Sequence, residues 1–395
     1  MKKLFYVLIV FVGILCSCGE KVNYSLQYEV IKSEADPKDL WLFSNRNYLL
    51  GIDPVTFEEK LVVEFNYYIS NPLYIDGKIY MSEEQHIVSH PKSTHYGNQI
   101  LCLNDDLTFN SEIQVFARPN DLSHCGDYLV ASSAAYFRDE EAEDIITSGF
   151  SIVDLKTNEC VYENKKLSDW ICNTDGSWSY KNRLFLGTYP GAFNDIFRVS
   201  VFNLDTMEFE AFNSRIFSSH PDEEKLKNEY AFVTLNDNQL WITYYFYHTI
   251  CVYDLDTYDP ENQTCERIAK IDLKKDYNIL QLANEPDLDD TEYDGDYRIH
   301  NGQFVNGKYH VVLAPERKDL LTETSFNGLL VINTTTFELE EAIEIDHENF
   351  LVGVDEIRYS ETDEDVLILR QYDNQIVTYD INTGAVLEEK TVCEK

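Results

Sequence analysis

The stretch IVTYDINTG at residues 376–384 decides the fold, because its pattern recurs along the chain. An apolar run ends at Asp380, and Thr383 follows three residues later. The same order of apolar run, Asp or Asn, two residues and Thr occurs seven times: Asp53–Thr56, Asp105–Thr108, Asp154–Thr157, Asn203–Thr206, Asp254–Thr257, Asn333–Thr336 and Asp380–Thr383. The first positions are 52, 49, 49, 51, 79 and 47 residues apart. Such regular spacing predicts a repeat architecture.

The chemistry of the motif predicts a tight hairpin. An Asp or Asn side chain at the start of a turn accepts a hydrogen bond from the backbone two residues on. The Thr then begins the next, more polar strand. A second repeat precedes most motifs and reads as a polar turn followed by a strand, as in IDGKIYMS (75–82) and NDNQLWITY (236–244). Each unit therefore contains four strands in roughly 50 residues, which is the size of a propeller blade.

The sequence therefore predicts an all-β protein: a single β-propeller of seven four-stranded blades, with six or eight blades as alternatives. The propeller is expected over residues 25–395, and the long 79-residue step indicates an acidic insertion near 275–300. The last strand, VLEEKTV (386–392), is expected to complete the last blade. Residues 24–33 are expected to supply an inner strand of the first blade.

The first residues predict an export signal. Met1-Lys2-Lys3 is basic, and the uncharged run 4–15 is too short to span a membrane, which takes about 20 residues. Leu15-Cys16-Ser17-Cys18 resembles the bacterial lipobox. This resemblance implies a lipid on Cys18, removal of the signal peptide 1–17, and a lipidated tether over 18–24. An ordinary secretory signal cut nearby is the alternative.

The motif and the lipobox together resemble a protein family. Strand–Asp–x–x–Thr–Gly hairpins recur in YVTN and TolB-like propellers, and residues 380–384 match this fuller form. The whole chain resembles the uncharacterised TolB-like β-propeller lipoproteins of the Bacteroidetes. The resemblance implies a lipid-anchored protein of the cell envelope, with the outer membrane as the expected location. It leaves open whether the protein faces the periplasm or the cell surface, and it brings no catalytic residues.

The charge and the cysteine count limit which partners and disulfides are expected. The chain has 32 basic and 70 acidic residues, and removal of 1–17 takes away two lysines, so the mature net charge is 30 − 70 = −40. Such a charge excludes nucleic acid as a natural partner. Seven cysteines remain beyond Cys16 and Cys18, so at least one is unpaired. Cys251 and Cys265 flank one predicted hairpin and are a possible pair; most others fall in strands and read as small buried side chains.

Any binding site is expected among the longer connections. In a four-stranded blade, consecutive turns alternate between the two faces of the disc, so the short motif turns share one face and the longer connections share the other. Binding residues on a rigid fold concentrate in such connections. The candidate ligand-binding residues are aromatic or basic: Tyr136, Arg138, Tyr189, Phe193, Tyr245, Tyr247, His248, Arg317, Arg370 and Tyr372. Packing of the connections against one another is the alternative for each.

Metal and cofactor signals are weak, so no metal and no cofactor is predicted. His86, His90 and His95 share one segment without a fixed acidic or cysteine ligand. Asp290, Glu292 and Asp294 imitate the start of a calcium loop, but its twelfth position is Asn301 instead of Glu. The G-x-S-x-G, P-loop and G-x-G-x-x-G motifs are absent from the sequence.

Two functions remain open. The sequence favours a lipid-anchored binding or scaffold protein that recognises a protein or glycan through its long connections, rather than an enzyme. The alternative is a carbohydrate-active hydrolase or lyase with two carboxylates at the central channel. Acidic residues are abundant throughout the chain, and no motif selects such a pair.

Overall fold

The structure is a computed structural model. It describes residues 26–86, 99–115, 119, 121–133, 137–138, 145–146, 149–164, 169–171, 178–190, 197–214, 216–217, 231–244, 248–273, 297–315, 326–345, 351, 354–360, 365–371 and 375–391. The signal peptide, the tether with Cys18 and most of the predicted insertion lie outside the described residues. No helix in the described part of the chain is long and apolar enough to cross a membrane.

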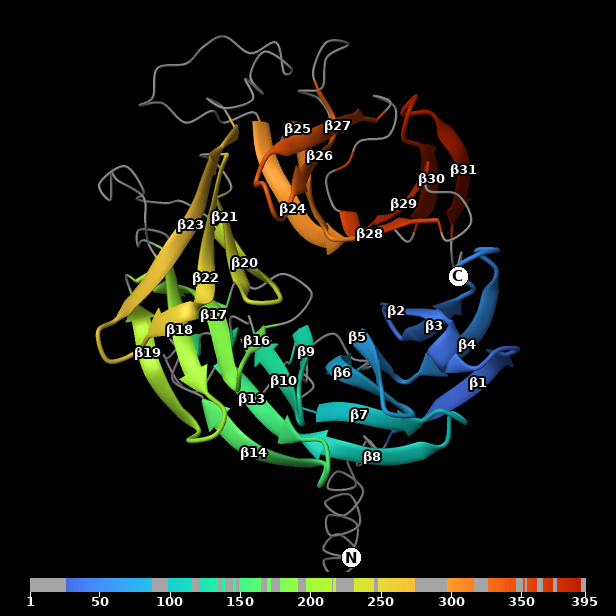
Figure 1. The fold of residues 1–395 in the computed structure, drawn as a ribbon. Coiled ribbons are helices and arrows are strands. Elements are labelled where there is room, and N and C mark those ends of the chain that lie inside the picture. Colours follow the sequence, from blue (N-terminus) through green and yellow to red (C-terminus); the bar gives the residue numbers. More distant parts are fainter. Residues whose placement is uncertain are drawn as a thin grey trace, which may run out of the picture.

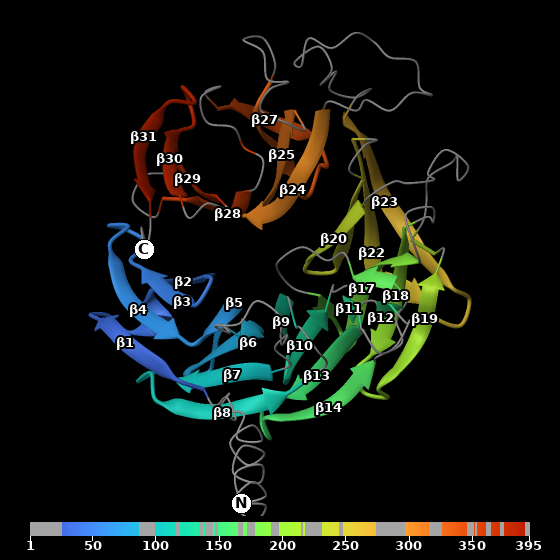
Figure 2. The same cartoon turned by 180° about the vertical axis from the view of Figure 1, so that it is seen from behind.

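Seven antiparallel sheets form the seven blades of a β-propeller, and almost no helix is present. Figures 1 and 2 show the sheets following one another around a ring. From inside to outside, blade 1 contains β2 (Trp41–Asn45), β3 (Tyr48–Ile52), β4 (Glu59–Phe65) and β1 (Tyr28–Ser33). Blade 2 contains β5 (Tyr67–Ile75), β6 (Lys78–His86), β7 (Gln99–Asn104) and β8 (Phe109–Gln114). Blade 3 contains β9 (Asp121–Cys125), β10 (Tyr128–Ser133), β13 (Gly149–Asp154) and β14 (Glu159–Asn164).

Blade 4 has a divided inner strand. Both β15 (Asp169–Ile171) and β16 (Ser179–Tyr180) pair with β17 (Arg183–Pro190), which is followed by β18 (Arg198–Asn203) and β19 (Glu208–Ser214). Blade 5 contains β20 (Ala231–Asn236), β21 (Gln239–Tyr244), β22 (Thr249–Asp259) and β23 (Thr264–Asp272). Blade 6 contains β24 (Tyr297–Val305), β25 (Lys308–Pro315), β26 (Gly328–Asn333) and β27 (Leu339–Glu344). Blade 7 contains β28 (Val354–Tyr359), β29 (Val366–Gln371), β30 (Gln375–Asp380) and β31 (Val386–Thr391).

The predicted seven-bladed propeller is thus confirmed. The final strand, β31, completes the last blade as predicted. Strand β24 begins at Tyr297, so the last four residues of the predicted insertion belong to blade 6 instead. Two short elements lie outside the seven sheets. They are the two-stranded ribbon of β11 (Phe137–Arg138) and β12 (Ile145–Ile146) and the 3-10 turn η1 (Pro37–Asp39).

The prediction that residues 24–33 form an inner strand was wrong. Strand β1 pairs with β4 at the outer edge of blade 1, and most of its side chains are exposed. An inner strand is covered by the neighbouring blades, so it requires apolar side chains on both faces. Residues Glu29 and Lys32 in β1 do not meet this requirement, whereas the WLF run of β2 does.

The motif turns form as their chemistry predicts. In five motifs, the Oδ1 atom of the first residue accepts hydrogen bonds from the backbone N–H groups two and three residues on. At Asp53 these two bonds measure 2.9 and 2.8 Å, and at Asn333 they measure 2.7 and 2.8 Å. The same pair of bonds is present at Asp154, Asn203 and Asp380. The side chain thus takes up two backbone donors that the turn would otherwise leave unpaired.

Two motifs deviate from this register. In blade 2 the turn begins at Asn104, one residue earlier than predicted, and its αL residue is Leu107 with φ of 65°. In blade 5 Asp254 accepts only from the N–H group two residues on, at 3.0 Å, and the strands continue past it to Asp259, which accepts from the N–H groups of Glu261 and Asn262. The hairpin of β22 and β23 is therefore longer than the others, as Figure 1 shows.

Apolar clusters between neighbouring blades form the core. Among the described residues, seven clusters occupy the seven interfaces, and the largest contains 15 buried residues between blades 4 and 5. The smallest contains seven, between blades 7 and 1: Trp41, Phe43, Leu50, Ile52, Val62, Ile368 and Ile376. The ring is therefore closed by side-chain packing, without a strand shared between its first and last blades.

Candidate functional site

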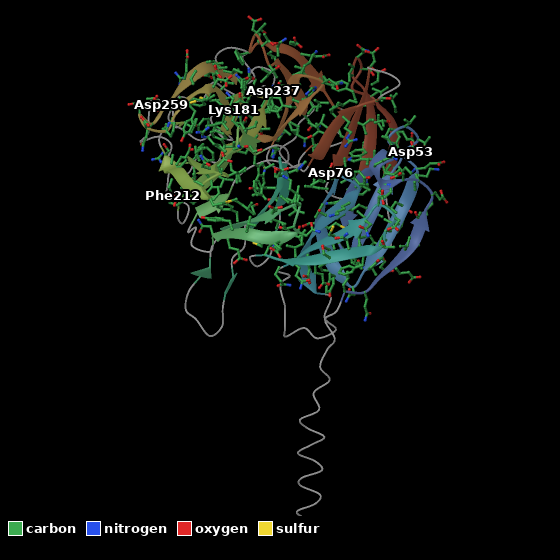
Figure 3. The ribbon with its side chains drawn as sticks, turned by 60° about the horizontal axis from the view of Figure 1, so that its bottom comes forward. Asp53, Asp76, Lys181, Phe212, Asp237 and Asp259 are labelled. Carbon is green, nitrogen blue, oxygen red and sulfur yellow. The ribbon has the colours of Figure 1, made fainter. Side chains whose placement is uncertain are left out.

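Strand direction separates the two faces of the disc. Except in blade 1, the turn after the inner strand and the motif turn both lie on one face, here called the turn face. In blades 2 to 7, the connections from the second to the third strand lie on the opposite face, here called the connection face. In blade 1 the motif turn between β3 and β4 lies on the turn face, because β4 ends only one residue before β5 begins. Figure 3 labels Asp53, Asp76, Lys181 and Asp237, which come from turns of four different blades and belong to the turn face.

Eight of the ten predicted ligand-binding residues have side chains outside the described part of the chain. Six of them lie outside the described residues: Tyr136, Phe193, Tyr245, Tyr247, Arg317 and Tyr372. For two others only the backbone is described. Arg138 lies in β11 opposite Ile145, and Tyr189 lies in β17 opposite Trp170. The ribbon of β11 and β12 thus belongs to the connection between β10 and β13, on the connection face.

His248 lies inside blade 5. Its side chain is 0% exposed, and its backbone has φ of 50° in the left-handed region. The carbonyl of His248 accepts a hydrogen bond of 3.0 Å from the Leu273 N–H, which joins the ends of β22 and β23. The described surface therefore does not present this imidazole to a partner.

Arg370 lies at the interface between blades 7 and 1. Its guanidinium carbon is 5.2 Å from the centre of the Phe43 ring, and the Arg358 guanidinium lies 4.5 Å from the Trp41 ring in the same way. Stacking of guanidinium groups on aromatic rings is favourable. The structure therefore gives Arg370 a packing partner at the ring closure, and it does not bring Arg370 and His248 together.

A pocket lies where the sequence did not point, on the turn face between blades 4 and 5. Its volume is about 680 Å³, within the usual range of small-molecule sites. Six residues line it: Ser179, Tyr180, Leu235, Asp237, Asn238 and Asp256. They come from three separate turns: the end of β16, the turn between β20 and β21, and the original motif position in β22.

Asp256 links the two blades at this pocket. Its Oδ1 atom accepts a hydrogen bond of 2.8 Å from the Tyr180 hydroxyl and another from the Lys181 ammonium. Its Oδ2 atom accepts a bond of 3.1 Å from the Asn238 amide. The bond from Lys181 and then that from Tyr180 lower the pKa of Asp256. A carboxylate held charged in this way cannot serve as a general acid.

A buried carboxyl group and a buried imidazole lie elsewhere in the fold. Glu83 in β6 is 1% exposed, and burial, with the nearby Glu112, raises its pKa to about 7. His310 in β25 is fully buried, and its Nε2 atom is 2.7 Å from the Tyr359 hydroxyl of blade 7. Burial lowers the pKa of His310 to about 4. Each group belongs to an interface between blades, and neither lines the pocket.

No group of three or more His, Cys, Asp or Glu residues within the described ranges has the arrangement of a metal site. The His86 side chain, His90, His95, Asp290, Glu292 and Asp294 lie outside the described part.

The predicted pairing of Cys251 and Cys265 was wrong, because both residues keep their thiols, without a disulfide, at the same apolar cluster. The Cys265 thiol donates a hydrogen bond of 3.3 Å to the Asp254 carbonyl. Cys102 and Cys125 are buried in strands, as predicted, and Cys160 is half-buried. Cys172 and Cys393 lie outside the described residues.

No protein-family model matches the chain, and no curated protein matches it. Among solved structures, the chain is similar to the dihydro-heme d1 dehydrogenase NirN in complex with DHE, with a TM-score of 0.50 and 12% identity. The match covers 93% of this chain and 66% of the NirN chain. The computationally designed Ika8 protein has a TM-score of 0.47 and 11% identity, with coverage of 93% and 88%. At these identities the NirN likeness concerns the fold alone.

Proposed function

We propose that this chain is a lipid-anchored binding propeller of the bacterial cell envelope, which recognises a protein or glycan through its connection face. The lipid on Cys18 anchors it to a membrane, with the outer membrane as the expected site. The strongly negative chain charge disfavours nucleic acid as the partner.

The contrast between the two faces supports this proposal. On the turn face, the motif turns are short and held by their own side-chain hydrogen bonds. On the connection face, long segments separate the strands, such as 87–98 between β6 and β7 and 134–148 between β10 and β13. A rigid ring that carries long, varied connections on one face is the usual design of a recognition protein.

The described pocket gives no support to an enzyme. Glycoside hydrolysis needs two carboxyl groups that differ in protonation, one acid and one base or nucleophile. The pocket offers Asp237 and Asp256, but both oxygens of Asp256 already accept hydrogen bonds from Tyr180, Lys181 and Asn238 instead of facing a substrate. A binding function therefore fits the described residues better than carbohydrate cleavage.

Two measurements test the proposal. Mass spectrometry of the mature protein should find an acylated N-terminal Cys18 and no lipid on a Cys18→Ser variant. The purified protein should retain ligand on a glycan array or an array of envelope proteins. The double variant Tyr245→Ala, Tyr247→Ala should weaken this retention, whereas Asp53→Asn on the turn face should not. Turnover of a glycan without retention of any ligand would contradict the binding function.

A further inference from the structure

The pocket between blades 4 and 5 lies on the face opposite to the proposed recognition surface. It is therefore a separate site, and it does not depend on what the connection face binds. Three turns that are distant in sequence meet here, and Figure 3 shows Lys181 and Asp237 at neighbouring positions on this face. The Tyr180 and Lys181 bonds to Asp256 fix the two blades relative to each other.

Hydrogen-bond accounting defines what the pocket can accept. The side-chain donors of the lining residues are already used: Tyr180 donates to Asp256, the Ser179 hydroxyl bonds to the Cys125 thiol, and the Asn238 amide donates to Asp254 at 2.9 Å and Asp256 at 3.1 Å. The remaining polar capacity is that of acceptors. No described residue donates to the exposed carboxylate of Asp237, and the Asn238 side-chain oxygen is another acceptor. A matching ligand must therefore supply several donors.

The size and the lining of the pocket limit which kind of donor-bearing ligand fits it. A single ammonium group would fill a small part of about 680 Å³ and would leave most of the wall beside the half-buried Tyr180 uncovered. The charge of Asp256 is already compensated by Lys181. Sugar rings combine vicinal hydroxyl donors, which a carboxylate accepts in pairs, with C–H faces that pack on aromatic and aliphatic side chains.

We infer that this pocket is a saccharide-binding site for one or two neutral sugar rings, with Asp237 and Asn238 accepting hydroxyl hydrogen bonds and the half-buried Tyr180 contacting the ring carbons. Asp237 is the residue on which specificity rests, because its carboxylate has free acceptor capacity and points to no internal partner among the described residues. The open form of the pocket lets the ends of a longer glycan extend into solvent.

A matched pair of variants tests the inference. Asp237 and Asp76 occupy the same position in the turn after the inner strand, with φ of 50° and 48°, and Asn is tolerated in this conformation. Asp76 does not line the pocket. Asp237→Asn and Asp76→Asn therefore make the same charge change in the same local geometry, and equal melting temperatures of the two variants show that both are folded.

Saturation-transfer NMR and calorimetry with maltose, cellobiose and N,N′-diacetylchitobiose provide the readout. At least one disaccharide should bind the unmodified protein. Its affinity should fall by about tenfold or more in Asp237→Asn, through loss of charge-assisted hydrogen bonds, and should stay unchanged in Asp76→Asn. Absence of binding by all three, equal binding by both variants, or Asp237-dependent binding of putrescine alone would overturn the inference. Because none of these outcomes involves the connection face, the proposed function is tested independently.

Discussion

Individual residues between blades determine how the stability of this propeller depends on pH. His310 and Glu83 are both buried at interfaces, one in blade 6 facing blade 7 and one in blade 2 facing blade 1. Burial disfavours the charged form of each side chain, so it moves their pKa values in opposite directions. Each group therefore makes the fold sensitive to a different pH range.

The His310 pair predicts a loss of stability in mild acid. The folded pKa of about 4 lies below the unfolded value of 6.5, so the unfolded chain takes up the proton first. Neutral His310 therefore contributes roughly 3 kcal/mol to the free energy of unfolding above about pH 6.5. This contribution is lost as the pH falls toward 4. Between pH 7 and pH 4.5, the free energy of unfolding measured in urea should fall by less for His310→Gln than for the unmodified protein. The exposed His124→Gln serves as a control and should behave like the unmodified protein.

Glu83 predicts the opposite trend. Its folded pKa of about 7 lies above the unfolded value of 4.5, so folding favours the protonated carboxyl. The contribution is present below pH 4.5 and is lost as the pH rises toward 7. Glu83→Gln, which removes this titration, should therefore exceed the unmodified protein in stability by roughly 3 kcal/mol at pH 8 and match it near pH 4. Equal stabilities at both pH values in urea unfolding would contradict this assignment.

At the scale of elements, the motif hairpin is the repeating unit, and one position in it carries backbone strain. The residue after the turn is left-handed in every blade: Phe57, Leu107, Asn158, Met207, Gln263, Phe337 and Gly384. Only the last is glycine, the residue that adopts this conformation without cost. At Gly384 an added Cβ would also lie 2.0 Å from the Glu344 carbonyl oxygen of blade 6.

This position predicts two opposite substitutions. Gln263 is exposed and has φ of 52°, so Gln263→Gly should relieve strain and raise the free energy of unfolding by about 1 kcal/mol. Gly384→Ala should lower it by more than that amount, since it introduces both the unfavourable φ and the clash with Glu344. Urea unfolding measures the free energy of unfolding of both variants. A Gln263→Gly protein less stable than the unmodified one would show that the lost side-chain contacts of Gln263 outweigh the relief of backbone strain.

The motif also shows how far sequence reasoning extends. Blade number and the position of most turns could be predicted, because the Asx hydrogen bond requires Asp or Asn at a fixed place. The start of the blade 2 turn at Asn104 could not be predicted, because Asn104, Asp105 and Asp106 all offer a suitable side-chain oxygen. The pocket could not be predicted either. Ser179, Asp237 and Asp256 are distant in sequence and meet only when blades 4 and 5 pack.

At the scale of the whole molecule, the interface between blades 7 and 1 distinguishes this ring. Its cluster is the smallest in the described part of the chain, and blade 7 supplies only Ile368 and Ile376 to its buried set. Polar contacts supplement it: the Lys390 ammonium donates to the Phe57 carbonyl, and Arg358 and Arg370 stack on aromatic rings of blade 1. Other interfaces also have a chain connection between their blades, which this one does not.

The closure therefore predicts where the ring opens first. Phe43→Ala should destabilise the protein by about 3–5 kcal/mol and should speed hydrogen exchange in β2, β3, β29 and β30. Exchange in blades 3 to 5 should remain close to that of the unmodified protein. Phe150→Ala removes a buried ring of the same size between blades 3 and 4 and should leave exchange at the closure unchanged. Uniformly faster exchange in all blades after Phe43→Ala would argue against a local opening.

The peripheral position of β1 has a mechanical consequence. A pull on the chain ahead of residue 26 reaches the ring through one rim strand, which is paired along a single side with β4 and fastened by the Tyr28 hydroxyl to the Leu107 carbonyl at 3.0 Å. Tension would peel this strand before it loaded the central packing. Blade 1 would keep β2, β3 and β4, and the six other sheets would keep all their strands. Under such a pull, β1 would detach first, and the packing of the ring would remain intact.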